Sequence, residues 1–174
     1  MKRIEANELK ERIDEILDLY NATYRVGEAA QQIDLEAIKH KILSTPSHKL
    51  WIYVIEAEHK IVASLWATAL TEQSDVEVDL SQWLDRQKCI YISEVFVDTH
   101  FRGKGLAKQL LQHFMKTCTT KAYHDLLIRV WDKNEVALKL YLDKGFVPVA
   151  HQMQTKHNAM GAYEMKKIYL HIKL

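Results

Sequence analysis

A short turn rich in glycine and basic residues is the part of the sequence best suited to bind an anion. The turn contains, in a row, Arg102, Gly103, Lys104 and Gly105, although the whole chain has only five glycines. Glycine lets a backbone pass close to a ligand, and the start of a helix offers free N–H groups. Residues 99 to 108 include no carboxylate that would use those groups. The turn therefore predicts a site for a phosphate or pyrophosphate.

Two standard phosphate-binding patterns do not fit this turn. The Walker pattern needs four residues between its glycines, followed by lysine and then serine or threonine, and the sequence lacks it. The dinucleotide pattern would need a third glycine or an alanine where Lys108 stands. When the turn is considered alone, a tight strand-to-helix connection without a ligand remains the alternative interpretation.

Strands and helices are expected to alternate around this turn. Residues 89 to 97 predict a strand whose apolar character suits burial on both faces, and a helix follows from about Gly105 to Thr119. Residues 125 to 131 predict another strand. The next segment predicts a turn and a helix that stops at Gly145. Two further strands are expected at residues 146 to 155 and 162 to 174, joined by a loop with Gly161.

The N-terminal half predicts a short strand at residues 2 to 5, two helices and a hairpin. The second helix begins behind Asp34 as a plausible N-cap and ends before Pro46. The hairpin strands cover residues 50 to 57 and 60 to 70, where β-branched and aromatic residues are frequent. Residues 71 to 88 are polar and acidic without a clear period, which indicates a long connection. The first helix is expected to face the core with Leu9, Ile13, Ile16, Leu17 and Tyr20.

Length and composition indicate one globular domain over residues 1 to 174, with 48% apolar residues to form its core. The apolar runs are too short to span a bilayer and the N-terminus lacks a signal-like segment, so a cytoplasmic location without membrane partners is expected. The net charge of +1 gives no overall basis for binding nucleic acid. Cys89 and Cys118 form no CxxC motif and the histidines show no ligand spacing, so no metal site is expected.

Two blocks of residues resemble motifs of the GNAT superfamily of N-acyltransferases. Residues 102 to 107 match its Arg/Gln-x-x-Gly-x-Gly/Ala pattern, again between a buried strand and a helix. Residues 134 to 146 resemble the second block, N-x-x-A-x-x-L-Y-x-x-x-G-F. The specific motifs lie between about Glu94 and Phe146, and the element order extends the likeness to the whole chain. The resemblance implies an α/β fold with a mixed, mostly antiparallel sheet of about six or seven strands, splayed at its centre and flanked by about four helices.

The resemblance also implies a site for acetyl-coenzyme A as co-substrate, with no metal. Asn134 would help to bind or orient coenzyme A, or would serve as a helix N-cap, and both roles are compatible. The edge of the strand at Val95, Phe96 and Val97 would pair with the pantetheine arm as an added strand. Backbone N–H groups of the turn would hold the pyrophosphate, which involves Arg102, Gly103, Lys104, Gly105, Leu106 and Ala107.

Acyl transfer to an amine needs a base for the amine proton and an acid for the leaving thiolate. Tyr141 matches the family tyrosine that donates a proton to the coenzyme A sulfur, and its alternative role is that of a core aromatic residue. Glu94 stands in an apolar strand where many family members place the carboxylate that takes the amine proton. The alternatives for Glu94 are a half-exposed position at a bulge or a pairing with a lysine. Cys89 and Cys118 are expected to be small core residues.

The acceptor is expected to be the primary amine of a small molecule, with a peptide or protein amine as the alternative. The acidic 71 to 88 connection would attract a cationic amine such as a polyamine, or would simply be a solvated loop. Tyr24 and Arg25 receive no role, because nothing distinguishes them from ordinary loop residues. Two other classes stay open, namely a non-catalytic module that binds or senses acyl-coenzyme A and a nucleotide-binding regulator. A monomer and a homodimer are both compatible with the sequence.

Overall fold

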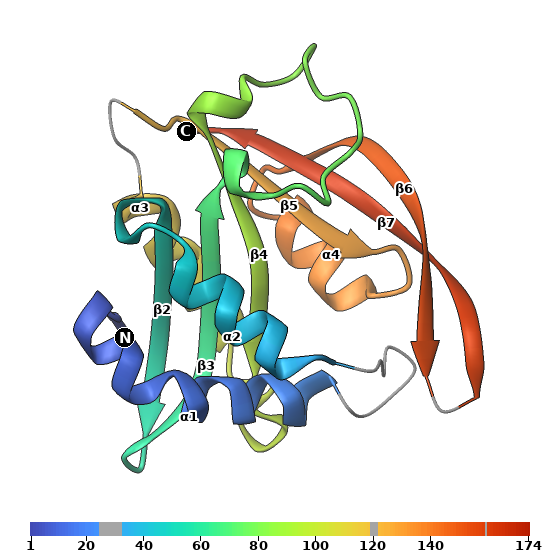
Figure 1. Ribbon diagram of the computed structural model, residues 1–174. Coiled ribbons are helices and arrows are strands. Elements are labelled where there is room, and N and C mark those ends of the chain that lie inside the picture. The colour runs from blue at the N-terminus through green and yellow to red at the C-terminus, as the bar shows by residue number, and fades with distance from the viewer. Residues whose placement is uncertain (25–32, 119–121, 159) are drawn as a thin grey trace. The chain divides into compact units, whose positions relative to one another are not determined.

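The computed structural model describes residues 1–24, 33–118, 122–158 and 160–174 (Figure 1). Arg25 and Thr119, which the sequence analysis mentioned, lie outside these residues. The helices of the described part are α1 (Ala6–Tyr24), α2 (Leu35–Ser44), α3 (Leu106–Thr117) and α4 (Glu135–Leu142). Its strands are β1 (Lys2–Arg3), β2 (Leu50–Ala57), β3 (Lys60–Ala69), β4 (Cys89–Val97), β5 (Asp125–Trp131), β6 (Val147–Asn158) and β7 (Gly161–Lys173).

The strands form one mixed sheet in the order β1-β2-β3-β4-β5-β7-β6. The pairs β1 with β2, β5 with β7, and β6 with β7 are antiparallel, whereas β4 and β5 are parallel. The register of β4 with β5 runs from Cys89 opposite Asp125 to Ile92 opposite Ile128. The expected α/β fold with a mixed, mostly antiparallel sheet and four helices is thereby confirmed for the described residues.

Two compact units make up the chain. The first unit comprises Met1–Ala67 and Glu94–Thr117, and the second comprises Thr68–Ser93 and Cys118–Leu174. The boundary passes through β3 and β4. Each unit therefore consists of two separate stretches of sequence.

In the first unit, α1 and α2 cover one face of β2 and β3 (Figure 1). Alternate residues of a strand point to the same face, and Leu50, Ile52 and Val54 all belong to this core. The predicted apolar face of α1 is confirmed, because all five of its residues are buried. The helix contributes Leu9, Ile13, Ile16, Leu17 and Tyr20 to the same cluster.

The opposite face of β2 carries α3. Tyr53 lies between two core residues of β2 and therefore points to the other side. Its ring makes an edge contact with Phe114 of α3 at 5.6 Å between centroids. Its hydroxyl lies 3.1 Å from Thr117 Oγ1 at the end of the same helix. Helices thus pack on both faces of this part of the sheet.

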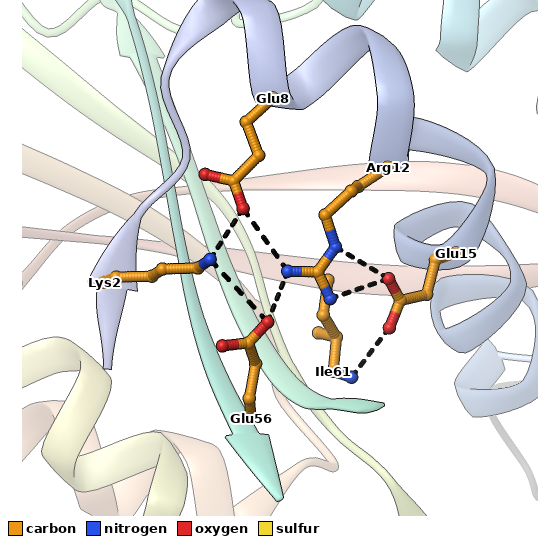
Figure 2. Close-up of polar contacts among 6 residues, drawn as sticks. All are labelled: Lys2, Glu8, Arg12, Glu15, Glu56 and Ile61. Atoms are coloured by element: carbon orange, nitrogen blue, oxygen red, sulfur yellow. Dashed lines mark hydrogen bonds and ion pairs between the residues drawn. The ribbon is translucent and has the colours of Figure 1, made fainter. Parts of the chain in front are cut away.

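A charged network fastens α1 to the β2–β3 hairpin (Figure 2). Arg12 donates to Glu56 of β2 and, at 2.9 Å, to Glu15 Oε2 of its own helix. The second oxygen of Glu15 accepts from the backbone N–H of Ile61 in β3 at 2.9 Å. Partial burial opposes the charged form of Arg12, but the hydrogen bonds to Glu56 and Glu15 outweigh it and raise the pKa of Arg12. The network therefore ties three elements of the first unit together.

In the second unit, the connection between β3 and β4 packs against the sheet. Most acidic side chains of this connection are exposed, as in a solvated loop, but the apolar residues Val76, Leu80 and Leu84 are buried, which the sequence analysis did not predict. They are buried against Tyr91 of β4 and Tyr169 of β7. The sequence did not reveal this packing, because the apolar residues stand among polar ones and follow neither a helical nor a strand period.

One arginine holds the connection in its folded shape. Arg86 Nη1 donates to Val76 O at 3.1 Å. Its Nη2 donates to Gln73 O at 3.0 Å and to Leu70 O at 3.3 Å. A guanidinium carries five donors in a fixed fork, so it can satisfy several carbonyl groups that a loop leaves unpaired.

The local helix signals were predicted correctly. Asp34 Oδ1 accepts from Ala37 N at 2.9 Å as the N-cap of α2, and Gly145 has a φ of +88° behind α4. The first strand is shorter than predicted and covers only Lys2–Arg3. α3 ends at Thr117, before the predicted Thr119. Among the described residues, no helix is long and apolar enough to cross a membrane.

Candidate functional site

The predicted phosphate turn adopts a backbone geometry that strongly favours glycine. Gly103 and Gly105 have φ angles of +75° and +74°, which disfavour residues with side chains. A Cβ atom at either position would meet no atom within 4 Å, so the backbone there is open. The first helical hydrogen bond of α3 runs from Gln109 N to Gly105 O. The preceding N–H groups, from Leu106 to Lys108, are the donors that a helix start leaves for an anion.

Positive charge surrounds this open backbone. Arg102, Lys104 and Lys108 are exposed, and the first turn of α3 contains no acidic residue. Lys104 Nζ lies 4.5 Å from the centre of the Phe101 ring. Before the turn, Asp98 Oδ1 accepts a hydrogen bond from the backbone N–H of His100 at 2.8 Å, and this bond lowers the pKa of Asp98. The turn can therefore hold a diphosphate by backbone donors and by charge.

The end of β4 presents different side chains to its two faces. Glu94 and Phe96 share one face, whereas Val95 and Val97 share the other. Phe96 is buried in the core of the first unit, and the two valines are half-buried. Any pairing of this segment with a pantetheine arm would thus use backbone groups, as the resemblance implied. Asp98 N, directly after the strand, donates to Val62 O at 2.8 Å.

Glu94 is half-buried and held by the end of α1. Tyr24 Oη donates to Glu94 Oε2 at 2.7 Å. Tyr20, one helical turn earlier, lies close enough for its hydroxyl to feel the charge of the same carboxylate. Burial, followed by the negative charge of Glu94, raises the pKa of Tyr20. The Glu94 carboxylate thus lies beside the phenols at the end of α1.

Aromatic rings fix the two tyrosines. The rings of Tyr20 and Tyr24 are 4.7 Å apart between centroids. Tyr20 stacks on Trp66 of β3 at 4.9 Å and meets the edge of Phe96 at 5.5 Å. The sequence analysis assigned Tyr24 no role and missed this contact. The spacing of Tyr20 and Tyr24, four residues apart on one helix face, was the available signal.

The second unit contains the other two predicted site residues. Asn134 Oδ1 accepts from Ala137 N at 3.2 Å, so its expected role as the N-cap of α4 is confirmed. Tyr141 lies on α4 with 6% of its surface exposed, and its ring centre is 6.1 Å from that of Phe146. Packing is one function of this side chain. Its part in proton transfer remains a prediction.

The two cysteines are unreactive core residues. Cys89 and Cys118 are both buried and unbonded to each other. Burial raises the pKa of Cys118 to about 12, and burial together with the charge of Asp125 raises the pKa of Cys89. A thiol must lose its proton to act as a nucleophile, so neither side chain is suited to carry an acyl group. In the described part of the chain, no three His, Cys, Asp or Glu side chains gather as a potential metal site.

Comparison with known proteins agrees with this combination of fold and turn. Residues 13–146 match the model of the acetyltransferase (GNAT) family. The chain therefore belongs to this family, as its two sequence blocks indicated. It is also 31% identical over 104 residues to an uncharacterized N-acetyltransferase, YycN, of Bacillus subtilis (strain 168). This match covers 60% of the chain and spans 58% of the length of that relative.

Solved structures share the fold at low sequence identity. A ribosomal-protein-alanine N-acetyltransferase from Brucella melitensis has a TM-score of 0.73 at 16% identity, covering 95% of this chain and 96% of that one. An N-acetyltransferase from Staphylococcus aureus Mu50 has a TM-score of 0.66 at 23% identity, covering 94% of this chain and 93% of that one. The IAA acetyltransferase from Bacillus cereus ATCC 14579 has a TM-score of 0.63 at 15% identity, covering 99% of this chain and 97% of that one.

Proposed function

We propose that this chain is an N-acetyltransferase that moves an acetyl group from acetyl-coenzyme A to a primary amine. The observation that carries the proposal is the open turn at the start of α3, where Gly103 and Gly105 adopt positive φ angles. Backbone donors of Leu106 and Ala107, with Arg102 and Lys104 beside them, would bind the pyrophosphate of the donor. Membership of the GNAT family supports acetyl-coenzyme A as that donor.

The transfer is a direct attack through a tetrahedral intermediate. The neutral amine nitrogen forms a bond to the thioester carbon, and the amine proton passes to the Glu94 carboxylate. A backbone N–H near Val95 or Phe96 would stabilise the developing oxyanion. The carbon–sulfur bond then breaks, and Tyr141 would donate a proton to the thiolate. The products are the acetylated amine and free coenzyme A.

The remaining donor contacts follow the same family pattern. The backbone of Val95, Phe96 and Val97 would pair with the pantetheine arm as an added strand. Asn134, besides capping α4, would orient coenzyme A. We place all these functions in one acetyltransferase domain formed by the whole chain.

The acceptor is a primary amine, and we favour that of a small molecule over that of a peptide or protein. The names of proteins with a similar fold differ on this point, since one names ribosomal-protein alanine and another names IAA. The half-buried Glu94, bonded to the hydroxyl of Tyr24, suits a narrow amine group better than a bulky one. A panel of small primary amines and of short peptides, assayed for thiol release, tests this preference.

Calorimetric titration of acetyl-coenzyme A into the purified protein tests the donor site. We expect a micromolar dissociation constant for the wild type and no measurable binding for Gly105→Glu, which places bulk and negative charge in the turn. Gly161→Glu is a matched control, because Gly161 also has a positive φ, of +120°, and open space around a built Cβ. Circular dichroism and thermal melting would verify that both variants fold.

The results separate the possible interpretations. Loss of binding in Gly105→Glu but not in Gly161→Glu would support the donor site. Absence of binding in the folded wild type would overturn the acetyl-coenzyme A proposal. Binding without thiol release from any amine in a broad panel would instead favour a module that senses acyl-coenzyme A.

A further inference from the structure

The carboxylate of Glu94 is held from a distant part of the chain. Tyr24 Oη donates to Glu94 Oε2 at 2.7 Å, although the two residues are 70 positions apart in the sequence. The ring of Tyr20 packs on that of Tyr24 at 4.7 Å between centroids, and the charge of Glu94 acts on its hydroxyl. We propose that Tyr20 and Tyr24 are positioning residues that keep Glu94 oriented and ionised for its work as the base. This inference rests on the proposed acetyl transfer.

The two phenols are themselves held rigidly. Tyr20 is buried, with 6% of its surface exposed, and stacks on Trp66 with an angle of 22° between the rings. The Trp66 indole N–H donates to Ser64 Oγ at 2.9 Å, and Ser64 in turn donates to Tyr53 O at 3.0 Å. This chain of contacts joins the tyrosine pair to the centre of the β2–β3 hairpin. An oriented donor loses little conformational entropy when it binds the carboxylate.

Hydrogen bonds from phenols favour the charged form of a carboxylate. Among the described residues, the titratable groups near Glu94 include the hydroxyls of Tyr20 and Tyr24 on α1, and β3 contributes the neutral Trp66 to the same cluster. Because the pKa of Tyr20 is raised, its hydroxyl stays protonated at neutral pH and remains a donor. The pair thereby opposes the effect that partial burial has on the Glu94 charge.

This arrangement affects one specific step. Glu94 must be ionised before it can accept the amine proton, so the tyrosines would set the lowest pH at which the enzyme works. They would also hold the Glu94 carboxylate in the orientation in which it accepts the amine proton. Removing one phenol hydroxyl should therefore change both the rate and its pH dependence, whereas a merely structural residue would change only stability.

Tyr24→Phe tests the inference, because it removes only the donating hydroxyl. We expect kcat/KM at its optimum to fall about 10-fold, with little change in the affinity for acetyl-coenzyme A. We expect the acidic limb of the pH profile to move upward by about 0.5 to 1 pH unit, since the charged carboxylate loses a donor. Tyr20→Phe should shift the limb in the same direction and provides an independent variant.

Tyr53→Phe is the matched control. Tyr53 is also a buried tyrosine of the first unit with a hydroxyl contact, but its partner is Thr117. This variant should melt at a lower temperature without any shift of the acidic limb. A folded Tyr24→Phe variant that behaves like Tyr53→Phe would overturn the inference.

A further variant separates this inference from the proposed function. Glu94→Gln should lose most activity, because the amide cannot accept the proton. If Glu94→Gln is inactive but the limb is unchanged in Tyr24→Phe and Tyr20→Phe, only the inference fails. If Glu94→Gln keeps the wild-type rate, Glu94 is not the base and the inference fails, while acetyl transfer itself stands; a wild type that acetylates no amine would overturn the proposed function instead.

Discussion

Arg129 Nη2 of β5 donates to Asp75 Oδ2 at 2.9 Å and so joins the sheet of the second unit to the 71 to 88 connection. The guanidinium carbon also lies 5.8 Å from the centre of the Tyr169 ring and 6.0 Å from that of Tyr91. Asp75 keeps 49% of its side chain exposed. An ion pair so open to water contributes little, so the ring contacts of Arg129 matter more. Packing and the three carbonyl contacts of Arg86 must therefore hold the connection.

Replacing Arg86 should loosen the whole connection. Arg86→Met removes hydrogen bonds to the carbonyl groups of Leu70, Gln73 and Val76. We expect the free energy of unfolding to fall by roughly 2 to 4 kcal/mol, as for several lost charge-assisted hydrogen bonds. Urea denaturation would measure the change. Arg86→Lys should recover only part of it, because one ammonium cannot reach all three groups, and a loss below about 0.5 kcal/mol would contradict this assignment.

The network around Arg12 should make stability depend on pH. The hydrogen bond from Arg12 lowers the pKa of Glu56 below its ordinary 4.5. A carboxylate with a lowered pKa in the folded state stabilises the fold above its unfolded pKa, and this contribution disappears as the pH falls through the folded pKa. Arg12→Gln should therefore cost about 0.5 to 1 kcal/mol at pH 7, and the difference from the wild type should shrink below about pH 4.

Denaturant titrations of wild type and Arg12→Gln between pH 7 and pH 3 would test this statement. Lys39→Gln is a control, because Lys39 pairs with Asp14, which is 75% exposed, and that pair should contribute almost nothing. A difference between wild type and Arg12→Gln that stays constant down to pH 3 would assign the effect to packing of the arginine stem.

The two roles of Asn134 are separable. Serine is also a good N-cap, so Asn134→Ser should keep the stability of α4, whereas Asn134→Ala should lose about 1 kcal/mol. If Asn134 also orients coenzyme A, both variants should bind the donor more weakly by a similar factor, as measured by titration calorimetry. Weaker binding in Asn134→Ala alone would restrict the residue to capping.

Tyr141→Phe isolates the hydroxyl from the packing of the ring. Because the ring of Tyr141 packs beside Phe146, the phenylalanine variant keeps this contact and should remain folded. We expect turnover to fall about 10- to 1000-fold with little change in donor affinity, the range for loss of a general acid. The measurement is thiol release under single-turnover conditions. An unchanged rate there would remove Tyr141 from the mechanism.

If Glu94 is kept in its charged form as we infer, it is a weak base, and this would favour acceptors whose amine loses its proton easily. An α-amine has a pKa near 8 and a lysine-like amine one near 10.4, so at neutral pH the neutral fraction of the α-amine is about 300-fold larger. A short peptide with a free N-terminus and an internal lysine should be acetylated mainly at the α-amine. Fragment-ion mass spectrometry would locate the group, and modification mainly at lysine would contradict the prediction.

Sequence signals that act over a few residues predicted their structures well. The positive φ of Gly145 behind α4 and the caps at Asp34 and Asn134 depend on neighbours within one helical turn. The period of α1 likewise revealed its buried face. Such features can be predicted from a few neighbouring residues, because the residue type itself limits the backbone conformation or supplies the capping side chain.

Features that depend on tertiary contacts were not predicted. The bond from Tyr24 to Glu94 joins residues 70 positions apart, and no local pattern specifies which helix end will meet which strand. The burial of Val76 and Leu80 depends on the surface that Tyr91 and Tyr169 create only after the sheet has formed. The register of a strand pair and the folding of a long loop thus remain beyond local reasoning.

The order of strands in the sheet has a consequence for how the polypeptide is made. β7 follows both β5 and β6 in the sequence, yet it lies between them and pairs with each (Figure 1). During translation β6 thus has no neighbour to bind until β7 leaves the ribosome. Phe96 and α3 are likewise synthesised well after the α1 and β2 residues against which they pack. A nascent chain stalled before β7 would expose β5 and β6 as unpaired edges, which makes this interval the one most open to aggregation or to chaperone binding.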